Sequence, residues 1–165
     1  MPDVGMADYQ MTRQKKIIQA CEKWWPREGP HRVLNKSDCS GFVRSVAIEL
    51  KVPFPNNVNN ANDIYFAIHS GPWSRIGFGS SAAHLAGAAA ANGKFVIGAN
   101  YMKGAHGHVI VVVDMNQASS QVPFRDVIGY WGKLNGVGKE HERISLAWRR
   151  SAFASVIFAA REFNL

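Results

Sequence analysis

Two residues capable of nucleophilic catalysis stand at well-defined places in the chain. Cys39 follows Ser37 and Asp38, which favour a helix start, so the cysteine falls in the first turn of a predicted helix. Unpaired backbone N–H groups and the helix dipole favour a thiolate there, the nucleophile that acyl transfer needs. About 70 residues later, His108 opens the apolar run VIVVVD, which predicts a strand holding an imidazole at a sheet edge. We therefore expect Cys39 and His108 to meet as nucleophile and general base.

The apolar pattern predicts the elements that would position these two residues. Helical spacing favours helices over residues 11–25, 37–50, 63–69 and 80–91, with residues 1–12 as a loose N-terminal arm. Beyond Gly93 the pattern changes, and strands are predicted over residues 94–98, 108–114, 126–131, 144–148 and 152–161. Helices followed by an antiparallel meander predict an α+β fold, with residues 1–165 forming one domain.

Composition excludes several classes of protein. The 165 residues are 47% apolar and 19% charged, which is typical of a globular domain and not of a disordered chain. The sequence contains no run of 18 apolar residues, so a membrane-spanning helix is not predicted. It contains only two cysteines, Cys21 and Cys39, too few for a disulfide framework. The first 16 residues contain no apolar core, so we expect no secretory signal peptide.

The net charge of +7 comes from scattered basic residues, without the basic stripe that nucleic-acid binding favours. Such a surface also suits an acidic polymer such as a bacterial wall. We expect no cofactor and no metal, because no phosphate-binding glycine pattern occurs and the histidines are dispersed. Five of the six histidines, His69, His84, His106, His108 and His141, are spread over different predicted elements.

Two short motifs, in this order, resemble the NlpC/P60 superfamily of papain-like cell-wall peptidases. They are Asp38–Val43 (DCSGFV) and Gly107–Val109 (GHV). A finer resemblance, to the first group of type VI secretion amidase effectors, rests on Ile17–Cys21, Asn35–Val43, Ser45–Pro53 and the glycine-rich Tyr130–Gly138. The resemblance implies a papain-like fold with N-terminal helices packed on an antiparallel sheet. It also implies hydrolysis of a peptidoglycan stem peptide at the γ-D-glutamyl–meso-diaminopimelate bond.

The resemblance assigns Cys39 as nucleophile and His108 as general base and then acid. Backbone N–H groups at Cys39 and Ser40 would hold the oxyanion, while Asp38 is expected to cap the helix. His106 competes with His108 because residues two apart share a strand face, but only His108 stands in the GHV position. The third member, which orients the imidazole, is either Asp126 or a backbone carbonyl in the segment 129–131, for which we take Trp131.

The resemblance also implies a monomeric antibacterial toxin made in the cytoplasm and delivered by a type VI apparatus to a target cell's periplasm. A cognate periplasmic immunity protein would then cover its groove. Alternatives within the same chemistry are a diaminopimelate–D-Ala crosslink endopeptidase, a phage-type wall lysin, and transfer to an amine or alcohol instead of water. An alternative of another class is a non-catalytic basic binding module in which Cys39 is a buried helix residue.

Overall fold

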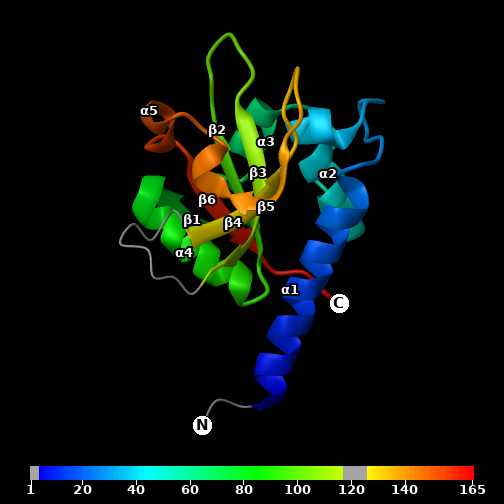
Figure 1. Cartoon of the computed structure of the whole chain (residues 1–165), viewed down its shortest axis with the longest axis vertical. Coiled ribbons are helices and arrows are strands. Elements are labelled where there is room, and N and C mark those ends of the chain that lie inside the picture. The colour runs from blue at the N-terminus through cyan, green and yellow to red at the C-terminus, as the bar shows by residue number, and fades with distance from the viewer. Residues whose placement is uncertain (1–3, 117–125) are drawn as a thin grey trace.

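A six-stranded antiparallel sheet forms the centre of the computed structural model, which describes residues 4–116 and 126–165 (Figure 1). The strand order is β1-β6-β2-β3-β4-β5. The strands are β1 (Ser74–Phe78), β2 (Phe95–Asn100), β3 (His108–Met115), β4 (Val127–Trp131), β5 (Lys139–Arg143) and β6 (Ile157–Arg161). Together with the helices, this sheet confirms the expected α+β class.

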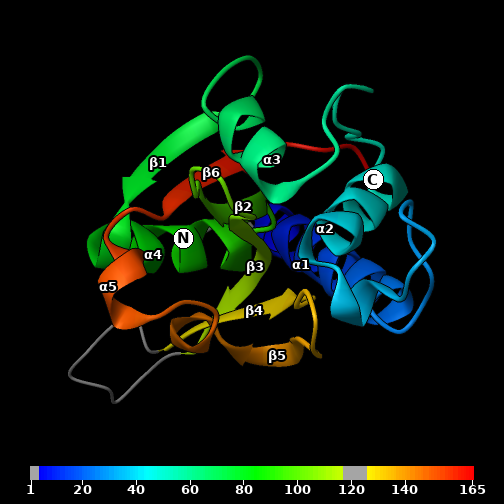
Figure 2. The same ribbon diagram turned by 90° about the horizontal axis from the view of Figure 1, so that it is seen from above.

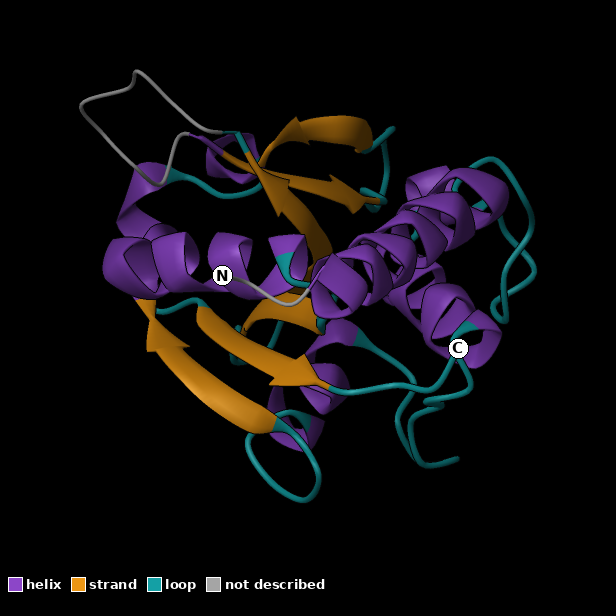
Figure 3. Cartoon of the chain, turned by 90° about the horizontal axis from the view of Figure 1, so that it is seen from below, coloured by secondary structure: helices purple, strands orange, loops and turns teal. Residues whose placement is uncertain are grey.

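Helices cover both faces of the sheet. They are α1 (Val4–Trp24), α2 (Cys39–Glu49), α3 (Ala61–Ala67), α4 (Gly79–Ala91) and α5 (Arg150–Phe153), with 3-10 turns η1 (Asn35–Ser37) and η3 (Ile144–Leu146). Figures 2 and 3 show α1 and α2 on one side of the strands and α4 on the other. Each side has its own apolar cluster, because β3 sends alternate side chains to opposite faces. Within the described ranges, no helix is long and apolar enough to cross a bilayer.

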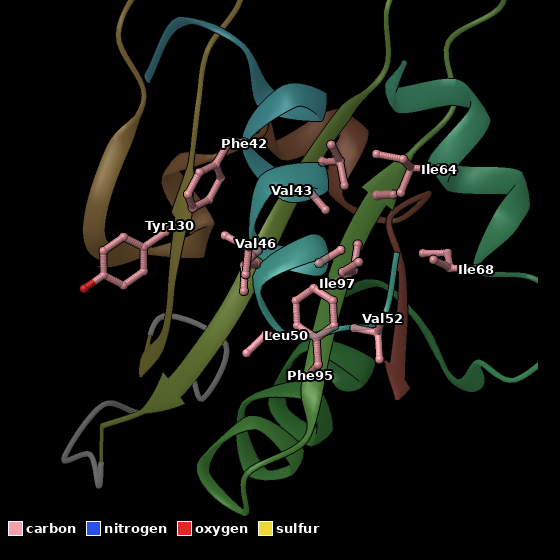
Figure 4. Packing of buried hydrophobic residues seen from close by; sticks show 14 of the residues in the cluster. Phe42, Val43, Val46, Leu50, Val52, Ile64, Ile68, Phe95, Ile97 and Tyr130 are labelled. Atoms are coloured by element: carbon pink, nitrogen blue, oxygen red, sulfur yellow. The ribbon is translucent and has the colours of Figure 1, made fainter. Parts of the chain in front are cut away.

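The helix that begins at Cys39 packs tightly on the sheet. Phe42, Val43 and Val46 recur at helical spacing on one side of α2 and are fully buried. They pack in one cluster with Phe95 and Ile97 of β2, as Figure 4 shows. Burial of each such side chain contributes about 1.5–3 kcal/mol, so this cluster fixes where the start of α2 lies relative to the strands.

The described part of the N-terminal arm expected over residues 1–12 is helical, because α1 begins at Val4, and most of its side chains from residue 5 onwards are exposed. The side chain of Arg13 explains how this helix is held. Its guanidinium donates hydrogen bonds to the Gly93 carbonyl (3.1 Å) and to Glu162 (2.7 Å). These contacts tie the N-terminal half of α1 to the turn before β2 and to the segment after β6.

The bounds and the order of the strands differ from the predicted meander. The range 144–148 contains the 3-10 turn η3 instead of a strand, and the range 152–161 contains the end of α5 and then β6. Strand β6 lies between β1 and β2, so the strands do not follow one another in chain order. The sequence patterns missed β1 and β5, both edge strands in which no residue is fully buried, because such strands lack a clear apolar alternation.

Candidate active site

Asp38 caps the helix that begins at Cys39, as predicted. Its backbone is extended, and one carboxylate oxygen accepts hydrogen bonds from the Gly41 N–H (3.0 Å) and the Ser40 hydroxyl (3.2 Å). The other oxygen lies 2.6 Å from His31 Nδ1. Because both oxygens are engaged, Asp38 fixes the first turn of α2 and is not available for proton transfer.

The sulfur of Cys39 lies where the start of α2 meets β3. The residue is only 7% exposed, and the backbone N–H groups of Val109, Ser40 and Cys39 itself interact with the sulfur. Burial raises the pKa of the thiol to about 11, and the Asp38 carboxylate adds to the rise, while the three backbone groups act against it. In the resting protein burial therefore opposes the thiolate that the helix start was expected to favour.

His108 is the first residue of β3 and lies opposite Asn100 of β2. Burial, and to a smaller extent the positive charge of Lys133, lowers the pKa of its imidazole to about 4. The ring contacts Trp148 edge to face, with centroids 5.4 Å apart. The imidazole is therefore neutral at pH 7 and able to accept a proton.

The two predicted catalytic residues are linked through the backbone at the start of β3. Val109, whose N–H faces the sulfur of Cys39, directly follows His108 along β3. The contact described for the imidazole is with Trp148, not with the sulfur. Catalytic hydrogen bonds are often long without substrate and tighten in the complex, so this arrangement is compatible with a nucleophile and its base.

Neither candidate for the third member is placed against the imidazole. Strand pairing sets Met115 opposite Val127, and the Asn116 N–H donates to the Asp126 carbonyl (2.8 Å). Asp126 thus lies opposite Asn116, about 25 Å along β3 from His108. The Trp131 carbonyl accepts a hydrogen bond from the Trp25 indole (2.9 Å). Over the described part of the chain, no side chain hydrogen-bonds to the imidazole.

Two residues that sequence reasoning missed support His108 instead. The Asn100 side-chain oxygen accepts hydrogen bonds from the His108 N–H (2.8 Å) and from the Trp148 indole (2.9 Å). Asn100 is buried, so these bonds are shielded from water. The only sequence signal for Asn100 was a polar residue closing an apolar strand, and for Trp148 there was none.

The loop that leads into β3 is held by Asn62 of α3. Its side-chain amide donates to the carbonyls of Met102 and Ala105 (both 3.0 Å) and accepts from the N–H groups of Met102 and Gly107 (both 3.1 Å). Gly107 itself has no room for a side chain, because a Cβ there would collide with the Asn100 carbonyl. This packing explains why glycine precedes the histidine. His106, the competing histidine, lies exposed in this loop and outside the strand.

The glycine-rich segment after β4 packs on the residues that lead into α2. The Lys133 and Gly138 N–H groups both donate to the Lys36 carbonyl (3.1 and 2.8 Å), and the Ser37 hydroxyl donates to the Gly136 carbonyl (2.6 Å). A Cβ at Gly132 would collide with backbone atoms of Asn35 and Asp38. The segment therefore fixes the backbone just before Cys39.

In residues 4–116 and 126–165, no group of three or more His, Cys, Asp or Glu side chains is placed to hold a metal ion. The arrangement that the structure does provide is a buried thiol, backbone N–H groups at a helix start, and a neutral imidazole on the residue before Val109, whose N–H meets the sulfur. Such groups can stabilise the oxyanion of a tetrahedral intermediate and form the covalent acyl intermediate that follows it.

Part of the chain is similar in sequence to a known protein. The chain is 39% identical over 98 residues to the peptidoglycan amidase Tse1 of Pseudomonas aeruginosa. The match covers 59% of this chain and 58% of that protein, so the chain spans little more than half the length of the curated relative. No family model matches the chain. It is thus similar in part to a peptidoglycan amidase, and membership of the NlpC/P60 superfamily stays a prediction.

Proposed function

We propose that this protein is a peptidoglycan amidase that hydrolyses the stem peptide by Cys–His nucleophilic catalysis. The observation that supports it best is the sulfur of Cys39 at the start of α2, against the N–H of the residue that follows His108. The partial similarity to a peptidoglycan amidase supports the substrate class. The bond we propose is the γ-D-glutamyl–meso-diaminopimelate amide.

In this mechanism His108 removes the proton of the Cys39 thiol as the sulfur attacks the amide carbon. The oxyanion accepts hydrogen bonds from the N–H groups of Cys39 and Ser40. The imidazolium then protonates the leaving amine, the C–N bond breaks, and a thioester remains on the sulfur. Water, deprotonated by His108, attacks the thioester, and the released thiol regains its proton. Asn100 and Trp148 hold the base through its backbone and ring.

Mass analysis of muropeptides after incubation with the protein tests the proposal and identifies the bond. We expect Cys39→Ala to lower turnover at least about 10³-fold, because the covalent route is lost. His108→Ala should lose nearly as much and the double variant little more, since residues that act as one unit are not additive. His106→Ala is the matched control and should keep most of the activity.

Turnover retained by Cys39→Ala would contradict the mechanism, and a larger loss in His106→Ala than in His108→Ala would reassign the base. Cleavage at the diaminopimelate–D-Ala bond would favour the crosslink endopeptidase instead. Absence of cleavage in any muropeptide would favour the non-catalytic binding module.

We further propose that the protein acts in the periplasm of a target cell, after delivery by a type VI apparatus, and that an immunity protein protects the producer. Growth of a Gram-negative host tests this proposal. A signal-fused wild type should lyse the cells, whereas signal-fused Cys39→Ala and the unfused wild type should be tolerated. Lysis by the unfused form, or equally by the Cys39→Ala form, would contradict a wall-directed toxin.

A further inference from the structure

A row of aromatic side chains lies at the end of the sheet where β2 leaves and β3 begins. We call it the aromatic platform; it consists of Tyr65, Phe66, His69, Phe78 and Tyr101. Ring centroids are 5.2 Å apart for Phe66 and Tyr101, 5.9 Å for Tyr65 and Tyr101, 4.5 Å for Tyr65 and His69, and 6.1 Å for His69 and Phe78. The rings therefore form one continuous surface across α3, the β2–β3 loop and the end of β1.

The platform presents its rings to solvent. Phe66 is 57% exposed, Phe78 43% and Tyr101 42%, while Tyr65 and His69 are half-buried beneath them. Large aromatic residues that are exposed together, and not singly, mark a surface that contacts another molecule. Their conformational freedom is already limited by the contacts between the rings, so binding costs little further side-chain entropy.

The platform is continuous with the candidate active site. Tyr101 directly follows Asn100, which accepts hydrogen bonds from the His108 N–H and the Trp148 indole. Asn62, in the same helix as Phe66, holds the loop between Tyr101 and His108 through its four hydrogen bonds. The platform therefore borders the residues that hold the backbone of His108.

We propose that the aromatic platform binds the glycan strand of the substrate, next to the stem peptide that the active site cleaves. This inference rests on the proposed function. Peptidoglycan consists of a charged peptide part and a glycan part, which is a chain of pyranose rings. The C–H faces of pyranose rings pack on the faces of aromatic rings, which carry partial negative charge. Exposed Asn56, Asn57 and Asn59 beside α3 offer amide groups for sugar hydroxyl and N-acetyl groups.

Oligosaccharide binding tests the platform without any hydrolysis. The probe is a tetramer of N-acetylglucosamine, titrated against the Cys39→Ala protein while tyrosine and tryptophan fluorescence is followed. We expect measurable binding that weakens at least about tenfold in Phe66→Ala and Tyr101→Ala. Phe66→Trp should retain it. Leu85→Ala is the matched control, because Leu85 is also 57% exposed but lies on α4, on the other face of the sheet.

Kinetics on two substrates then separate this inference from the proposed function. For Phe66→Ala and Tyr101→Ala, kcat/KM should fall at least about tenfold more on a glycan-linked fragment than on the free stem peptide. Leu85→Ala should match wild type on both. Equal losses on the two substrates, no oligosaccharide binding, or a dimer of wild type that Phe66→Ala dissociates would overturn the platform. Wild type that binds the oligosaccharide but cleaves neither substrate would refute the proposed function alone.

Discussion

Burial shifts the pKa values of the two candidate catalytic side chains in opposite directions. It raises the pKa of the Cys39 thiol to about 11 and lowers that of the His108 imidazole to about 4. Both groups are thereby kept neutral at pH 7. The pair then holds its proton on sulfur at rest, and the base takes that proton only as the sulfur attacks.

This resting state predicts a broad pH profile. The active form has a protonated thiol and a neutral imidazole, which coexist between the two pKa values. We therefore expect kcat/KM to be nearly constant between about pH 5 and 10, with an acid limb from His108 and an alkaline limb from Cys39. Alkylation of Cys39 by iodoacetamide should accelerate about tenfold per pH unit over the same range, since only the thiolate reacts.

An alkaline limb near pH 8, or fast alkylation that does not change with pH, would indicate a thiolate–imidazolium pair at rest and would contradict this prediction. Cys21 is the internal control for alkylation. Burial also raises the pKa of its thiol, and the side chain is completely inaccessible in the core, so it should stay unreacted in the folded protein.

At the scale of elements, the nucleophile depends on the contact between η1, the start of α2 and the segment after β4. Gly132 lies against backbone atoms of Asn35 and Asp38, which cannot move aside as the end of a flexible side chain would. The position of Cys39 is therefore set jointly by its own helix cap and by a segment almost 100 residues further along the chain.

Gly132→Ala should destabilise the protein by about 2–3 kcal/mol and lower kcat, because the added methyl group forces the start of α2 away from β3. Gly136→Ala is the matched control. A Cβ there meets only the side chain of Lys133, no closer than 3.5 Å, so a change within about 0.5 kcal/mol is expected. Urea unfolding and muropeptide turnover measure both effects. Equal behaviour of the two variants would show that this contact does not position Cys39.

The elements that sequence patterns predicted correctly are those with a local signal. Helix α2 has an N-cap followed by apolar residues at helical spacing, and β3 is an unbroken apolar run. Strand β5 has neither, because Lys139–Arg143 is polar throughout and lies at an edge of the sheet. A strand was expected directly after β5, over 144–148, but the first three of these residues form η3, whose Ile144 is buried in the core.

In the candidate site, too, the residues with a local sequence signal were predicted and the others were missed. Cys39 and His108 stand in short motifs, whereas Asn62 and Trp148 gain their roles from contacts about 40 and 48 residues distant in sequence. Asp126 was a reasonable third member on strand order, but the pairing of β3 with β4 places it at the far end of the sheet from His108. Register of that kind depends on the whole sheet, including a bulge between Val112 and Asp114.

At the scale of the molecule, the two apolar clusters hold the sheet between α1, α2 and α3 on one side and α4 on the other. The candidate site lies at the end of the sheet where β3 begins, at the edge of the hydrophobic core. His108 is therefore part of the packing as well as of the chemistry, since its ring contacts Trp148, which in turn contacts buried Phe153. Its protonation is coupled to folding.

This coupling predicts a loss of stability in acid. The pKa of His108 is about 4 in the folded protein and 6.5 is the ordinary value for the unfolded chain, so the unfolded state binds the proton more readily. The stabilisation is fully present above pH 6.5 and is lost as the pH falls towards 4. Over this window the free energy of unfolding of wild type should fall more than that of His108→Gln, by at most about 3 kcal/mol.

Urea unfolding at pH 7, 5.5 and 4 in wild type and His108→Gln measures that difference, and titration of the carboxylates, common to both proteins, cancels. His84→Gln is the matched control, because His84 is exposed on α4 and its removal leaves the core packing in place. It should retain the wild-type dependence on pH. If His108→Gln loses stability in acid as steeply as wild type and His84→Gln, then the imidazole is not held neutral by the fold, and the same result would remove the acid limb assigned to His108 in catalysis.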